Sequence, residues 1–159
     1  MSSHIISRRQ LLRASLYGAA STTLPLAPAF ASEARWRNWS GLQTANPRWR
    51  LNPSSSRELM AALPIAPAPI RPIGASHSFA PLSVGEGTQV SLEDMSGLLA
   101  YNDVLHRARM RAGTSIREAA ILLTGVGQAF SNQGDIDSQS LAGACGTSTH
   151  GTGRELGSF

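Results

Sequence analysis

The sequence predicts an α+β fold in which short helices and short strands alternate. Two capping boxes, Ser55 with Glu58 and Ser115 with Glu118, each mark the start of a helix, because the two side chains satisfy free N–H groups of the first turn. Short apolar or alternating runs between turn-forming residues are typical of strands and surround both predicted helices. The length of 159 residues suggests one domain.

The first elements expected are an extended piece from Trp49 to Pro53 and a helix that begins at Ser55. The apolar side of this helix is expected to consist of Leu59, Met60 and Leu63. A proline cluster follows and prevents the helix from continuing. It favours an extended approach into a strand at 70–73. The prolines of this cluster are Pro64, Pro67, Pro69 and Pro72.

Strands are next expected at 90–92 and 99–101. Residues 104–112 alternate in type and predict a longer strand whose one face is a solvated row of arginines. These arginines are Arg107, Arg109 and Arg111. The second helix should run from Ser115 to near Gly125. The Gly-Val-Gly at 125–127 is not a dinucleotide fingerprint, because Phe130 stands where a small residue is needed.

Composition excludes several chemistries. All fourteen basic residues are arginines, so the chain can hold neither a P-loop lysine nor a Schiff base. Three of these arginines lie in the predicted leader. Eleven arginines therefore remain against ten acidic residues, and the resulting net charge of +1 does not indicate nucleic-acid binding. The single Cys145 allows no internal disulfide and is expected to be a small buried thiol.

Residues 1–31 are typical of an export signal. Arg8 and Arg9 precede two leucines, which resembles a twin-arginine signal, and Ala29-Phe30-Ala31 offers a cleavage site before Ser32. An ordinary Sec signal is the alternative. Prolines interrupt the apolar run well short of a membrane span, so a membrane anchor is not indicated. We expect a periplasmic or extracellular protein in which residues 32–48 are a polar lead-in rather than a packed element.

Two runs of small residues carry the functional signal. The first motif is Gly-Ala-Ser-His-Ser-Phe at 74–79, directly after a predicted strand, and the second motif spans 135–153. Small residues let backbone N–H groups approach an anion closely. Taken alone, His77 could simply cap a turn, and His150 could bond only to nearby backbone. A metal site and a serine hydrolase are not favoured, because neither the ligand spacing nor the Gly-x-Ser-x-Gly pattern is present.

Together, the two motifs resemble the FAD-binding (PCMH-type) domain of the vanillyl-alcohol-oxidase-type flavoproteins, most closely its sugar-lactone (D-arabinono-1,4-lactone and L-gulonolactone) and alditol oxidases. Their order and separation also match that family. The resemblance implies that His77 is bonded covalently to the 8α-methyl carbon of FAD. It further implies that the flavin is contacted by Ile73, Gly74, Ala75, Ser76, His77, Ser78, Asp137, Ser140, Gly143, Gly146, Thr149, His150, Gly151 and Thr152.

The resemblance covers only the first part of such a domain. It implies a first subdomain at about 49–112 and the start of a second at 113–159, so the chain is expected to be a truncated piece, inactive alone. A complete relative would oxidise a carbinol of a sugar lactone or alditol with FAD, and oxygen or another acceptor would reoxidise the flavin. No catalytic acid or base can be assigned within the 159 residues. The alternative is a non-catalytic remnant or binding module.

Overall fold

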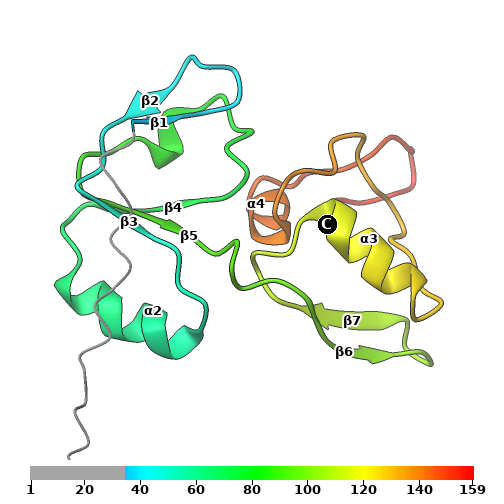
Figure 1. Ribbon diagram of the computed structural model, residues 1–159. Helices are drawn as coiled ribbons and strands as arrows, with labels where there is room; N and C mark the ends of the chain where they lie inside the picture. Colours follow the sequence, from blue (N-terminus) through cyan, green and yellow to red (C-terminus); the bar gives the residue numbers. More distant parts are fainter. Residues whose placement is uncertain (1–34) are drawn as a thin grey trace, which may run out of the picture.

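The computed structural model describes residues 35–159, so the predicted leader lies outside the described part. Figure 1 shows these residues as two neighbouring lobes. The first lobe ends with the strand β5 (Thr88–Ser91), and the second begins with the strand β6 (Leu98–Asn102). Helices and strands occur in both lobes, which confirms the α+β prediction. Within residues 35–159, no helix is long and apolar enough to cross a membrane.

A three-stranded parallel sheet forms the centre of the first lobe. Its order is β3 (Trp49–Leu51), β5, β4 (Ile70–Ile73), so both predicted strands around the proline cluster are confirmed. Ile70 pairs with Thr88, and Ile73 pairs with Ser91. The central strand β5 is buried at all four of its positions. The chain enters the first motif at the carboxyl end of β4, the edge at which open α/β sheets bind their ligands.

The helix α2 (Ser56–Ala62) packs against one face of this sheet and continues into the 3-10 turn η1 (Leu63–Ile65). Its predicted cap is confirmed, because the Ser55 hydroxyl accepts a hydrogen bond from the Glu58 N–H at 3.3 Å. The small core consists of Leu51, Ala62 and Val90, with Leu59 and Leu63 packed against it. Met60 was expected in the core and is exposed instead. Ala62, three residues after Leu59 in the helical repeat, takes the inward position.

Residues 35–48 correct another expectation. They form a small antiparallel hairpin, β1 (Trp36–Arg37) with β2 (Thr44–Ala45), and Trp36, Asn38 and Ala45 are buried. Figure 1 shows this hairpin on the side of the sheet away from α2. The expected unpacked lead-in is therefore packed over 35–48. The polar composition of this segment suggested that it is solvated. Its indole and amide groups instead bond to a loop far along the chain.

A second antiparallel hairpin opens the second lobe. It joins β6 to β7 (Arg107–Met110), and both strands are largely exposed. The strand predicted from residue 104 begins only at Arg107, because 103–106 form the turn. Arg107 and Arg109 are exposed as expected. Figure 1 places this hairpin beside α3 (Ile116–Thr124).

The helix α3 begins where its capping box predicts. The Ser115 hydroxyl accepts from the Glu118 N–H at 3.1 Å, and the helix buries Ile116, Ala119 and Leu123 along one side. The C-cap lies at Gly125, as expected.

In the first lobe, the 3-10 turn η2 (Pro81–Ser83) follows the first motif, and the buried Gln89 donates to the Ser83 carbonyl at 2.9 Å.

The helix α4 (Leu141–Gly146) was not predicted, because its run of small residues indicated a loop. Local hydrogen bonds hold it at both ends. The Ser140 hydroxyl caps its start by accepting from Gly143 N–H. At its end Ser148 adopts the left-handed conformation (φ 52°), and Thr149 N–H donates to the Ala144 carbonyl at 2.9 Å, the bonding of a Schellman motif. Cys145, expected to be buried, is exposed because only Ala144 of this helix faces inward.

Candidate functional site

The first motif is held by its carbonyl oxygens. Four consecutive carbonyls accept hydrogen bonds from the N-terminal hairpin. The donors are Trp39 N to Ser76 at 3.1 Å, Trp39 Nε1 to His77 at 2.9 Å, Asn38 Nδ2 to Ser78 at 3.0 Å and Gln43 Nε2 to Phe79 at 3.2 Å. By contrast, the backbone N–H groups of residues 75–79 donate to no other residue within 35–159. One side of the loop is thus bonded to protein, and a run of N–H donors is left for a ligand.

Ser76 gives this loop its shape. Its φ of 61° is in the left-handed region, which costs a residue with a side chain of the order of 1–3 kcal/mol. The buried indole of Trp36 offsets this cost by donating from Nε1 to the Ser76 hydroxyl at 3.2 Å. A left-handed residue flanked by ordinary ones turns successive N–H groups toward one concave side, which suits a phosphate.

The His77 ring is fixed on two sides. Its plane stacks on Trp39, with 5.4 Å between ring centroids and 24° between planes. Its Nε2 lies 2.8 Å from the Ser138 hydroxyl, at hydrogen-bond distance, although 61 residues separate the two in sequence. A second aromatic contact joins Trp39 edge-on to Phe79. The imidazole is therefore oriented by groups outside its own loop.

The two predicted motifs meet in space, as a shared site requires. Gly74 lies so close to Ser140 that a Cβ at position 74 would come within 2.6 Å of the Ser140 Oγ. Together with the bond from His77 to Ser138, this approach joins the end of β4 to the segment that leads into α4. A side chain at position 74 would separate the motifs, which gives a physical reason for glycine there.

The segment 137–140 is anchored to the start of α3. Arg117 and Asp137 form a two-pronged ion pair with N–O distances of 2.9 and 2.8 Å, and the Ile116 N–H donates to the Gln139 carbonyl at 2.9 Å. The hydrogen bond from Arg117, with its charge, lowers the pKa of Asp137 below its ordinary value. The Asp137 carboxylate and its backbone carbonyl both bond to Arg117, so this residue holds the second motif in place.

The remaining predicted residues lie along the exposed end of the second motif. Gly143 and Gly146 lie within α4, and 149–152 follow it. His150 is exposed, and its Nδ1 donates to the Gly151 carbonyl at 2.8 Å. It makes no contact with His77 among the described residues, so the two histidines do not form a pair. In the first motif, Gly74, Ala75 and Ser78 are exposed, whereas Ile73 is half-buried at the end of β4.

Several contributors, Trp39, Asn38 and Ser138 among them, were not singled out from sequence. Trp39 and Asn38 lie in the segment interpreted as a lead-in, and the only available signal was its unusual tryptophan content. Ser138 lies within the second motif, but its pairing with His77 depends on how the two lobes meet. These residues contact the site across chain separations that a local pattern does not encode.

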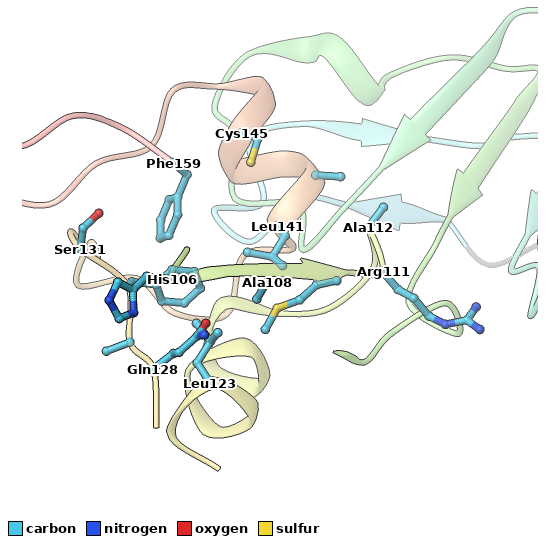
Figure 2. Close-up of a pocket in the computed structure, with 14 residues that line it drawn as sticks. His106, Ala108, Arg111, Ala112, Leu123, Gln128, Ser131, Leu141, Cys145 and Phe159 are labelled. Atoms are coloured by element: carbon cyan, nitrogen blue, oxygen red, sulfur yellow. The ribbon is translucent and has the colours of Figure 1, made fainter. Parts of the chain in front are cut away.

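A separate hollow of about 500 Å³ lies in the second lobe. Figure 2 shows His106, Leu123, Leu141 and Phe159 around it. Its lining is mostly apolar and includes Cys145, but no residue of the first motif. It is therefore distinct from the site around His77. In the described part of the chain, no group of three or more His, Cys, Asp or Glu residues is placed to hold a metal.

These features fit a phosphorylated cofactor. The first motif offers free N–H donors without bulky side chains, and the glycines of both motifs leave space for close approach. His77 adds a nucleophilic ring at the junction of the motifs. The donor set thus suits an anionic group beside an oriented histidine.

Comparisons with known proteins agree with this geometry. The sequence profile described as "FAD binding domain" matches residues 47–158. An L-gulono-1,4-lactone dehydrogenase of Mycobacterium tuberculosis is 30% identical over 121 residues, which cover 74% of this chain and 28% of that protein. A D-arabinono-1,4-lactone oxidase of Candida glabrata is 29% identical over 128 residues, covering 74% of this chain and 24% of that protein.

The fold is also found in a solved structure. Cholesterol oxidase from B. sterolicum superposes with a TM-score of 0.65 over 82% of this chain and 26% of that protein, at 22% sequence identity. At that identity the likeness concerns the fold, which is the PCMH type. The chain spans about a quarter of the length of the relatives it matches.

Proposed function

Because the chain belongs to the FAD-binding domain family, we propose that it forms part of an oxidoreductase in which His77 binds FAD covalently and the substrate is a sugar lactone or an alditol. When bound, FAD would accept a hydride from a carbinol carbon of that substrate. The free N–H groups of residues 75–79 would hold the pyrophosphate. His77 would keep the flavin from dissociating.

One observation carries this proposal. Four consecutive carbonyls of the first motif, at 76–79, are bonded to the hairpin, while the N–H groups of 75–79 stay free beside a histidine that is already oriented. A histidine that only capped a turn would not require the left-handed Ser76 beside it, nor four bonded carbonyls on the opposite side of its loop. The names of both relatives support a lactone as substrate. The name of the oxidase supports oxygen as the proposed acceptor that reoxidises the flavin.

The test uses the protein expressed at its full natural length. After denaturation and gel separation, the band should fluoresce as flavin under acid, because a covalent bond survives unfolding. His77→Ala should abolish this signal. The matched control is His106→Asn, which changes an exposed histidine in the turn of the second hairpin and keeps a side chain that tolerates its φ of 50°. Fluorescence that persists in His77→Ala would refute the assignment.

We also propose that residues 1–31 direct export by the twin-arginine route to the periplasm or beyond. Support comes from the arginine pair before two leucines and from the small residues at 29–31. That route suits a protein whose cofactor is inserted before export.

A further inference from the structure

We propose that Ser138 and Trp39 are positioning residues that set the orientation and the tautomer of the His77 imidazole for its bond to FAD. This inference rests on the proposed covalent attachment at His77. It goes further by assigning the preparation of that histidine to two residues outside the first motif. One comes from the N-terminal hairpin and the other from the second lobe.

The contacts of His77 define what each residue does. Trp39 fixes the plane of the ring by stacking, and its Nε1 bonds to the His77 carbonyl at 2.9 Å, so one indole holds both the backbone and the side chain. Trp39 is itself 56% exposed, so burial in the core does not place it. Its position is instead fixed by its two bonds to the first motif.

Ser138 fixes the rotation of the ring within that plane. Its hydroxyl lies 2.8 Å from Nε2, at hydrogen-bond distance, and Nδ1 has no hydrogen-bond partner among residues 35–159. A serine hydroxyl can donate or accept, so the contact at Nε2 fits either tautomer. In the tautomer that we propose, Nε2–H donates to the Ser138 oxygen, and the lone pair of Nδ1 is the nucleophile.

Covalent attachment of FAD to His77 is a two-electron oxidation. A bond forms between Nδ1 and the 8α-methyl carbon, and one C–H bond of that methyl group breaks. Nε2 gives up its proton through the exposed Ser138 hydroxyl to solvent. In net terms, the imidazole N–H and the methyl C–H lose two hydrogen atoms with two electrons. Dioxygen takes these up and becomes hydrogen peroxide.

The first measurement follows covalent attachment over time, with the cofactor-free protein mixed with FAD at its full natural length. Ser138→Ala should slow attachment about tenfold, the effect of losing one orienting hydrogen bond. Ser138→Thr keeps the hydroxyl and should stay close to the wild-type rate. Ser131→Ala changes another exposed serine, which makes no side-chain hydrogen bond to the described residues, and should have no effect. Trp39→Leu, which loses the stack, should be slower than Trp39→Phe.

The second measurement needs no flavin. Long-range ¹H–¹⁵N spectra of the cofactor-free chain at alkaline pH report the His77 tautomer. The wild type should show Nε2–H alone, and Ser138→Ala should show a measurable share of Nδ1–H. A wild type that acquires no covalent flavin would refute the proposed function. A wild type that acquires it, with Ser138→Ala equal in both rate and tautomer, would overturn the positioning role alone.

Discussion

At the scale of single residues, the small side chains of the two motifs act by allowing close approach. Gly74 shows this most clearly, because a methyl group there would lie 2.6 Å from the Ser140 Oγ. That hydroxyl is not free to move, since it caps α4 by accepting from the Gly143 N–H. The same serine therefore serves the helix and the junction between the motifs.

Gly74→Ala should accordingly destabilise the protein by about 1 kcal/mol, the usual cost of losing a helix cap. It should also weaken flavin binding, because the motifs would move apart. Chemical denaturation measures the first effect and flavin titration the second. Gly157→Ala is the matched control, since a methyl group there meets nothing within 4 Å. Equal stability of both variants would show that the Ser140 side chain moves aside without loss.

At the scale of elements, the second motif depends on α3. The segment 137–140 is tied to the first turn of this helix by the ion pair between Arg117 and Asp137 and by backbone hydrogen bonds. Because Ser138 lies in this segment, the helix indirectly places the partner of His77. A capping box that looks purely local thus contributes to the position of the site.

The ion pair makes a pH-dependent contribution. Since the pKa of Asp137 is lowered in the folded state, its stabilisation is complete above the ordinary pKa of aspartate and is lost as the pH falls through the lowered value. Asp137→Asn should therefore melt at a slightly lower temperature than wild type at neutral pH and at the same temperature in strong acid. The difference should be small and sensitive to salt, because the Arg117 side chain is exposed and the Asp137 side chain is only half-buried.

Thermal melts across pH test this expectation, with Asp135→Asn as the control. Asp135 is exposed and forms no ion pair within the described residues. Its variant should track the wild type at every pH. A stability difference for Asp137→Asn that persists unchanged into acid would mean that the carboxylate charge is not what stabilises this segment.

At the scale of the whole molecule, the site lies where the two lobes meet. Trp39 follows β1 and His77 follows β4 in the first lobe, whereas Ser138 and Ser140 lead into α4 in the second (Figure 1). The hydrogen bond between His77 and Ser138 crosses this junction. The position of the His77 ring therefore depends on how the two lobes sit together.

The proposed export concerns the whole molecule as well, because a twin-arginine route carries folded protein. Fused to a reporter, residues 1–31 should direct it out of the cytoplasm. Replacing Arg8 and Arg9 with lysine should retain it there, since that route reads the arginine pair. Cell fractionation gives the readout, and replacing Arg13 alone with lysine serves as the control. Export of the double-lysine fusion at the wild-type level would indicate a Sec signal.

The sequence alone determined the local features of this protein. Two serine caps, a proline cluster and short apolar runs act over a few residues, so both capped helices and the strand before His77 were predictable. The two motifs also identified the FAD-binding family. The short helix α4 was missed, because its glycines have poor helix propensity, and because its N-terminal N–H groups bond to the distant carbonyls of Ala112 and Thr114.

Only the tertiary structure decided which residues surround His77. Trp39 precedes it by 38 residues and Ser138 follows it by 61, and neither distance leaves a periodic trace in the sequence. A polar stretch such as 35–48 looks solvated when its hydrogen-bond partners are unknown. It becomes packed once four carbonyls of a distant loop accept its donors. Sequence patterns report short-range propensity and burial, whereas hydrogen bonds between distant segments form only when the lobes come together.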